Sequence, residues 1–255
     1  MEVIAIAQQK GGTGKTTTTA TIAAGLARQG KRVLMLDLDP QTNLSYIMGA
    51  DTTGATIADV LQGKTPAATA TQAIKAETLP GVATAAIIPG SAFLAGADAN
   101  LQGNRREYVL ADALRPLARA FDFCIIDTPP ALGILTVNAL TAATRVIIPC
   151  LPDVLSIQAT AQIAATIEGI KQSSNPKIKI AGVLLTRYTP RQNLTKDITD
   201  ILTDAAQQIG TTLFNTKIRE SVTIREAQTM GKDLFSYAPK SKAAADYQHL
   251  IEEIF

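Results

Sequence analysis

The stretch VIAIAQQKGGTGKTT, residues 3–17, decides the fold of this 255-residue chain. Five apolar residues predict a buried strand, a glycine-rich loop follows, and residues 15–29 then have helical spacing. Glycines let a backbone curl so that successive N–H groups point inward, and the positive end of the following helix dipole reinforces them. A strand, such a loop and a helix in this order are the setting that a phosphate-binding loop requires.

The side chains of this loop predict nucleotide chemistry. We expect Lys15 to reach the β- and γ-phosphates of ATP, the Thr16 hydroxyl to ligate Mg²⁺, and Thr17 to contact the α-phosphate. The alternative, a glycine-rich turn that only joins a strand to a helix, would not need so many constrained positions. The backbone around the phosphates would come from four residues: Gly11, Gly12, Thr13 and Gly14.

Outward from the loop, apolar runs alternate with longer stretches of helical spacing. Strands that are nearly all apolar predict a parallel sheet buried on both faces. We therefore expect a doubly wound α/β fold, with a mostly parallel sheet flanked by helices on both faces and an active site at the carboxyl ends of the strands. The strands are predicted at residues 3–7, 32–37, 123–127, 145–150 and 179–186, and the helices at 15–29, 105–119, 155–172 and 193–209.

The remaining segments give weaker patterns. A short helix at residues 57–61 and a strand at 82–88 are predicted, and residues 65–79 fit either a helix or a loop. Residues 240–254 predict a closing amphipathic helix. With no repeat and no long linker, we expect residues 1–255 to form a single domain, without an N-terminal helix-turn-helix domain.

Composition favours a globular, soluble protein: 46% of residues are hydrophobic, 18% are charged, and no apolar run approaches the roughly 20 residues needed to cross a bilayer. Cys124 and Cys150 are expected to be small core residues in a reducing cytoplasm. From Lys171 to Lys242 there are twelve Lys or Arg against six Asp or Glu, although the net charge is only +2. This basic region fits either a polyanionic partner or ordinary solvated surface.

Two predicted strands end in aspartate. Asp37 and Asp39 lie in LDLDPQTN, residues 36–43, and Asp127 lies in IIDTPP, residues 125–130. A carboxylate at the end of the strand beside the loop is positioned to hold Mg²⁺ next to Thr16, and we assign this role to Asp127. The Asp-Pro pair that begins at Asp39 is also a common turn signal, so on local grounds a structural role there is equally possible.

The loop departs from the ordinary G-x-x-x-x-G-K-[ST] pattern, because Gln9 replaces the first glycine and Lys10 adds a second lysine. KGGTGKT, residues 10–16, resembles the deviant Walker A motif of the ParA/MinD family. The resemblance implies an ATPase that forms an ATP-bound sandwich homodimer, with Lys10 crossing to the partner's nucleotide. It also implies that Lys10, Lys15 and Asp39 are catalytic, with Asp39 activating water, and that Asp37 is either near the Mg²⁺ shell or structural.

The resemblance extends into the C-terminal half. Where relatives read Ile-Pro-x-Asn beside adenine, this chain has Ile-Arg-Glu-Ser at residues 218–221, so the base contacts would fall to Arg219 and Ser221. ParA-like proteins bind DNA without sequence preference through a basic surface. Here the matching residue is Arg191, and Lys196, Lys217 and Arg225 are its expected companions.

The family contains members with different cargo, and the sequence separates some of them. The acidic end YQHLIEEIF, residues 247–255, lacks the basic face of a membrane-inserting helix, so no membrane partner is expected. The resemblance implies a cytoplasmic, nucleoid-associated partition ATPase that works with a centromere-binding, ParB-like adaptor. Two alternatives stay open: a relative that positions a protein machine, and a nucleotide-switched scaffold with negligible hydrolysis.

Overall fold

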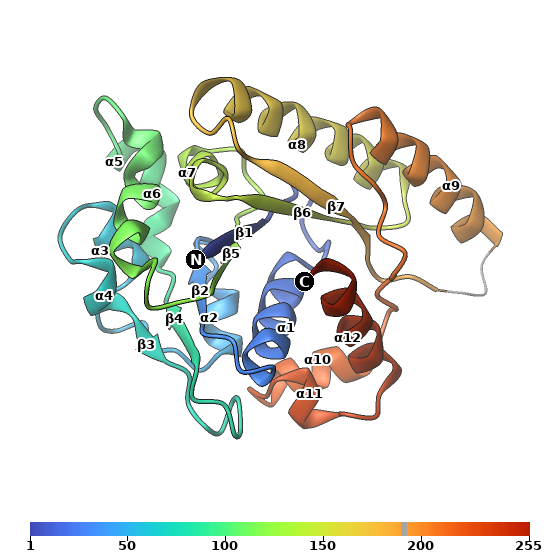
Figure 1. Ribbon diagram of the computed structural model, residues 1–255, viewed down its shortest axis with the longest axis horizontal. Helices are drawn as coiled ribbons and strands as arrows, with labels where there is room; N and C mark the ends of the chain where they lie inside the picture. The colour runs from blue at the N-terminus through green and yellow to red at the C-terminus, as the bar shows by residue number, and fades with distance from the viewer. Residues whose placement is uncertain (190–192) are drawn as a thin grey trace.

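The computed structural model describes residues 1–189 and 193–255, and it describes side chains outside residues 190–197. One sheet of seven strands, in the order β3-β4-β2-β5-β1-β6-β7, forms its centre (Figure 1). Every pairing is parallel except that of β3, which runs antiparallel to β4. The strands are β1 (Glu2–Ile6), β2 (Val33–Asp37), β3 (Gln72–Ala73), β4 (Ala85–Ile88), β5 (Phe123–Asp127), β6 (Arg145–Cys150) and β7 (Lys179–Leu185).

The α-helices cover both faces of this sheet (Figure 1). No helix within the described residues combines the length and apolar character that a membrane crossing requires. In chain order the α-helices are α1 (Lys15–Arg28), α2 (Asn43–Ile47), α3 (Ile57–Leu61), α4 (Ala67–Ala70), α5 (Ala97–Asn100), α6 (Val109–Leu114), α7 (Ile134–Ala142), α8 (Val154–Ser173), α9 (Asn193–Gln208), α10 (Val222–Thr229), α11 (Leu234–Tyr237) and α12 (Lys242–Ile254).

Alternation along the strands divides the core into two layers. In β1, Val3 and Ala5 pack on one side with the buried faces of α7 and α8, whereas Ile4 and Ile6 pack on the other side with α1 and α12. Successive side chains of a strand point to opposite faces, so a strand covered on both faces must be apolar throughout. This is why the Val- and Ile-rich runs predict the sheet so directly, and the expected doubly wound α/β fold is confirmed.

Some local predictions differ from the structure. The helix expected at residues 105–119 is split into the 3₁₀ turn Arg106–Tyr108, α6 and a second 3₁₀ turn, Arg115–Leu117, which contains Pro116. Proline removes a helical N–H and clashes with the preceding turn. The sequence analysis did not predict α7, because its residues ILTVNALTA are buried on nearly all sides and carry no amphipathic period.

Both edges of the sheet carry short covering segments. At one edge, β3 pairs with β4 through only two residues. At the other, isolated bridges join Val183 to Leu213 and Tyr188 to Arg219, so the segment after α9 runs beside β7. Cys124 and Cys150 are buried free thiols, as expected of small core residues.

The carboxyl edge of the sheet gathers the loops that carry the predicted chemistry. In the parallel register, Ile6 of β1 and Asp37 of β2 are both aligned with Asp127 at the end of β5. The loops after these three strands therefore leave the sheet at the same level, and the phosphate loop after β1 lies next to Asp127, with Asp37 one strand further along.

Gly182 in β7 provides a test of core packing. A Cβ atom there would lie 2.5, 2.7 and 2.8 Å from three carbons of the Phe214 ring. We expect Gly182→Ala to lower the free energy of unfolding by about 1–3 kcal/mol. The matched control is Gly169→Ala on the exposed side of α8, where an added Cβ would meet no described atom within 4 Å beyond its chain neighbours and the backbone of its own helix; it should stabilise by about 0.4–1 kcal/mol. Thermal melts of both variants check this, and equal melting temperatures would contradict it.

Candidate active site

The loop between β1 and α1 has the backbone of an anion-binding site. Gly12 and Gly14 have φ values of 75° and 85°, in the left-handed region that side chains disfavour. Gly14 precedes the first residue of the 14-residue helix α1, and no side chain caps that helix. The first N–H groups of α1 are therefore available to a ligand, and the helix dipole favours an anion there.

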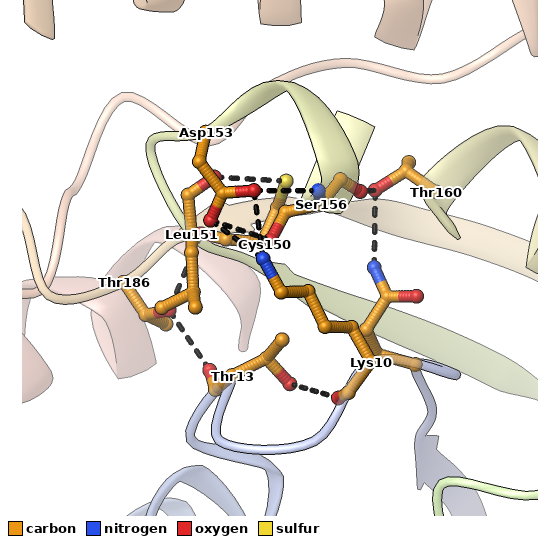
Figure 2. A network of polar contacts seen from close by, with 9 residues as sticks. Lys10, Thr13, Cys150, Leu151, Asp153, Ser156, Thr160 and Thr186 are labelled. Carbon is orange, nitrogen blue, oxygen red and sulfur yellow. Dashed lines mark hydrogen bonds and ion pairs between the residues drawn. The ribbon is translucent and has the colours of Figure 1, made fainter. Parts of the chain in front are cut away.

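Side chains from distant elements anchor this loop (Figure 2). The Thr186 hydroxyl, just past β7, donates to the Thr13 carbonyl at 2.8 Å. On the other side of the loop, the Gln8 amide donates to the Thr160 hydroxyl of α8 at 3.1 Å and accepts from the Gln9 N–H at 2.8 Å. The ends of β7 and α8 thus fix the loop in place before any nucleotide binds.

Lys15 and Asp127 form the buried centre of the site. Lys15 is 7% exposed and Asp127 is 0% exposed. Burial lowers the pKa of Lys15, whereas Asp127 and Asp39 act to raise it. Burial raises the pKa of Asp127 well above its usual value and the charge of Asp37 adds to this, while the nearby Thr16 hydroxyl and Lys15 oppose it. The fold therefore buries the opposite charges of Lys15 and Asp127 together at the N-terminus of α1.

The donor set fits Mg²⁺. Neither carboxylate oxygen of Asp127 has a hydrogen-bond partner among the described residues, and the Thr16 hydroxyl lies near without reaching hydrogen-bond geometry. No group of three or more His, Cys, Asp or Glu side chains in the described chain is arranged to hold a metal. Mg²⁺ bound by one or two protein oxygens and completed by phosphates matches this arrangement. Thr16 and Asp127 would hold the ion, which would supply positive charge to the phosphates.

Asp37 has a different environment from Asp127. Its Oδ2 accepts from the Ser45 N–H at 2.8 Å and from the Ser45 hydroxyl at 2.7 Å, and its Oδ1 accepts from the Asp39 N–H at 3.2 Å. Of the two roles expected for Asp37, these contacts favour the structural one. Direct ligation of Mg²⁺ by Asp37 stays a prediction.

Asp39 lies one turn beyond β2 and is 8% exposed. Its Oδ1 accepts from the Gln41 N–H at 2.9 Å. Thr42, the residue before α2, has φ of 55° in the left-handed region, so the chain turns sharply between Asp39 and α2. The charge of Asp39 acts to raise the pKa of Lys15.

Lys10 lies at the outer side of the loop and forms an ion pair within its own chain. Its Nζ is 2.7 and 2.8 Å from the two carboxylate oxygens of Asp153 (Figure 2). Asp153 also caps α8 by accepting from the Ser156 N–H at 2.9 Å. Although partial burial acts to raise the pKa of Asp153, the bonds from Lys10 and Ser156 bring it below its usual value. The sequence analysis did not identify Asp153 as a partner of Lys10.

A cavity of about 190 Å³ opens beside the loop, next to Thr17. Arg219 and Ser221, the expected base contacts, both line it. The Arg219 guanidinium is already paired with Asp246, at 2.6 and 2.7 Å. Gln228 of α10, which the sequence analysis missed, also lines the cavity, and its amide donates to the Thr17 hydroxyl at 2.9 Å.

The four expected DNA contacts are only partly described. Arg191 lies outside the described residues, as does the side chain of Lys196. The Lys217 ammonium lies 5.1 Å from the centre of the Tyr188 ring. Arg225 is exposed and lies 3.6 Å from the Glu220 carboxylate, and it lines the cavity beside the loop. The position of Arg225 is therefore as consistent with a contact to the nucleotide as with a contact to DNA.

The buried carboxyl of Asp127 predicts a pH-dependent stability. Because its folded pKa is raised, the folded state holds a proton that the unfolded state releases, so its carboxylate destabilises the nucleotide-free protein more as pH rises above about 4. We expect Asp127→Asn to raise the melting temperature at pH 8, with the gain shrinking toward pH 5. Asp122→Asn is the control of opposite sign, because the pKa of Asp122 is lowered to about 2. Melting curves across this range check both, and a gain for Asp127→Asn that grows on acidification would contradict the prediction.

Comparisons with known proteins agree with this geometry. The family described as an AAA domain matches residues 1–180. The chromosome partitioning protein ParA of Caulobacter vibrioides is 38% identical over 259 residues, covering 100% of this chain and 94% of the relative. The sporulation initiation inhibitor protein Soj of Bacillus subtilis is 35% identical, covering 99% of this chain and 98% of the relative.

A solved structure is similar to this chain over nearly its whole length. Cobyrinic acid a,c-diamide synthase from Mycobacterium smegmatis, with bound ADP and magnesium, superimposes with a TM-score of 0.83 at 34% identity and covers 99% of this chain and 93% of that one. The glycine-rich loop, the buried lysine and aspartate beside it, and these full-length matches lead to one conclusion. The chain belongs to the ParA/MinD family of P-loop ATPases, whose members bind adenine nucleotides with magnesium.

Proposed function

We propose that this ATPase partitions plasmid or chromosomal DNA: with Mg-ATP it dimerises and binds DNA without sequence preference, and an adaptor prompts hydrolysis and release. The adaptor would be a centromere-binding, ParB-like protein, and the DNA-bound state would lie on the nucleoid in the cytoplasm. Relatives at 34–38% identity that are named chromosome partitioning proteins support this choice of cargo.

The surroundings of Lys10 carry the proposal of a dimer. Next to the ion pair with Asp153, the first turn of α8 exposes Val154 and Leu155 at 63% and 65%, and Leu132 after β5 is exposed at 44%. Exposed apolar side chains around a charged group are typical of a surface that a protein partner covers. A second copy of the chain facing this edge would place its own triphosphate opposite Lys10, where a cation stabilises phosphate charge.

Support for DNA binding is electrostatic. The basic excess between Lys171 and Lys242 includes Lys217, which is half-buried and whose ammonium lies 5.1 Å from the centre of the Tyr188 ring. Phosphate contacts of this kind give affinity without sequence specificity. The other two functions expected from the sequence, positioning of a protein machine and a scaffold with negligible hydrolysis, would use the same nucleotide site without this basic surface.

The two lysines of the loop should separate nucleotide binding from dimerisation. We expect Lys15→Ala to weaken ATP binding by at least about 30-fold, since loss of a buried charge contact costs about 2–5 kcal/mol. Lys10→Ala should keep ATP affinity within about 3-fold but lose the ATP-dependent dimer, because Lys10 is partly exposed and bonds only at the outer side of the loop.

Sedimentation velocity with and without Mg-ATP, beside a nucleotide-binding titration, checks both variants. Lys64→Ala, an exposed lysine at the end of α3, is the control and should behave as wild type. An unchanged ATP-dependent dimer in Lys10→Ala would remove the crossing role of Lys10.

DNA binding predicts a definite salt dependence. With Mg-ATP, the affinity for a random duplex should fall linearly in a log–log plot against salt. Lys217→Ala should lower the steepness of that line by about 0.9, the value for one phosphate contact. Arg191→Glu should weaken retention at low salt while sparing ATP binding. Fluorescence anisotropy at several salt concentrations measures this, with Lys64→Ala again as control. Wild-type protein without salt-sensitive DNA binding would favour the machine-positioning or scaffold functions.

A further inference from the structure

A buried chain of hydrogen bonds fixes the segment that follows β2. Gly90, Ser45 and Asp37 form this chain, which we call the Ser45 relay. We propose that Ser45 is a positioning residue for ATP hydrolysis. Its hydroxyl fixes the carboxylate of Asp37, and Asp37 in turn fixes the backbone that directs Asp39 at the phosphate loop. The inference rests on the proposed role of Asp39 in activating water.

The first link joins Ser45 to Asp37. Both residues are 0% exposed. The N–H and the hydroxyl of Ser45 donate to the same oxygen, Oδ2, at 2.8 and 2.7 Å. Two donors from one residue clamp a carboxylate oxygen in a single direction, and hydrogen bonds to a charged acceptor in a dry interior are among the strong ones.

The second link joins Ser45 to the segment after β4. The Gly90 N–H donates to the Ser45 hydroxyl oxygen at 2.8 Å. Since the hydroxyl accepts here and has one proton, that proton is directed to Asp37. The Ser45 hydroxyl therefore satisfies a buried N–H on one side and a buried carboxylate on the other, and an alanine would leave both short of a partner.

Close packing explains why glycine occupies position 90. A Cβ atom there would lie 2.9 Å from Cγ of Asp37 and 3.0 Å from the Asp37 carbonyl oxygen. The backbone at Gly90 thus lies directly against Asp37 and prevents its carboxylate from swinging toward β4. The relay closes on Asp37 from two elements, α2 and the end of β4.

The third link reaches Asp39. The free side of Asp37, Oδ1, accepts from the Asp39 N–H at 3.2 Å. With Asp37 fixed at both oxygens, the backbone at Asp39 is fixed as well, and the Asp39 side chain is oriented further by the Gln41 N–H at 2.9 Å. Positions of catalytic groups must hold to well under 1 Å for efficient turnover.

The relay also determines where negative charge lies. Burial raises the pKa of Asp37, but the hydrogen bonds from Ser45 and from Asp39 oppose this and favour its charged form. The charge of Asp39 acts to raise the pKa of Asp37, and the charge of Asp37 acts to raise that of Asp127. If the Ser45 hydroxyl were lost, Oδ2 of Asp37 would keep only the backbone N–H of residue 45, and its carboxylate would be held less firmly.

The test is the intrinsic ATPase rate of the full chain with Mg-ATP, without DNA or adaptor. We expect Ser45→Ala to lower kcat about 10-fold, equivalent to about 1.4 kcal/mol, with KM for ATP changed by less than about 2-fold. Ser91→Ala is the matched control: it makes the same chemical change beside Gly90 but removes only the cap to the Phe93 N–H. It should keep wild-type kcat.

A double-mutant cycle with Asp37 separates positioning from general destabilisation. If Ser45 acts through Asp37, then Asp37→Asn should also lower kcat, and adding Ser45→Ala to it should lower kcat no further. Losses that multiply, a matching rise in KM, or wild-type kcat in Ser45→Ala would each overturn the relay. Should Ser45→Ala fail to fold, Ser45→Cys takes its place, because a thiol fills the site but is a weak donor and acceptor.

Measuring the ATPase rate of Asp39→Ala in the same experiment distinguishes a failure of the Ser45 relay from a failure of the role proposed for Asp39. Lost turnover in Asp39→Ala with unchanged turnover in Ser45→Ala overturns the relay alone. Wild-type turnover in Asp39→Ala removes the role of Asp39 and the relay with it. A wild-type protein that hydrolyses ATP but neither dimerises nor binds DNA contradicts the proposed partition function and leaves the relay to be decided by the kcat measurements.

Discussion

The attraction between the buried Lys15 ammonium and the buried aspartates around it is the interaction on which the site depends. Moving charges out of water costs several kcal/mol each, and the cost is recovered only when partners satisfy them. This compensation is incomplete: no group of the described residues donates a hydrogen bond to either carboxylate oxygen of Asp127, and Asp37 adds like charge nearby. A nucleotide triphosphate with its magnesium would add phosphate oxygens for the Lys15 ammonium and a cation for the Asp127 carboxylate, so the ligand would complete the charge balance of the site.

This incomplete balance explains why so much of the fold supports one edge of the sheet. Thr186 and Gln8 hold the phosphate loop from two sides, Asp153 holds Lys10, and Ser45 holds Asp37. Thr186, Asp153 and Ser45 lie outside the loop, and each orients a group of the nucleotide site. Preorganised polar groups of this kind stabilise developing charge without a further cost of reorganisation.

The sequence predicted what local pattern encodes. Residues 3–17 identified the loop, and IIDTPP identified Asp127, because strand, loop and helix follow each other directly along the chain. It missed what the topology brings together across long separations: Asp153 lies 143 residues from Lys10, and Gln228 lies 211 residues from Thr17. It also missed α7, whose residues are buried on nearly every side, and expected one helix where Pro116 breaks it. Periodicity reports on half-buried elements and says little about those buried throughout.

The two covered margins of the sheet limit how molecules of this protein can associate. An open strand margin is a template for continuous pairing between chains, and short or obstructed end strands are a common protection against aggregation. With β3 lying antiparallel across one margin and the segment around Leu213 along the other, backbone pairing is blocked on both sides. The dimer proposed above would form instead at the end of the sheet where the nucleotide loop lies. Assembly there would be reversible when the ligand changes, whereas strand-to-strand growth would be hard to undo.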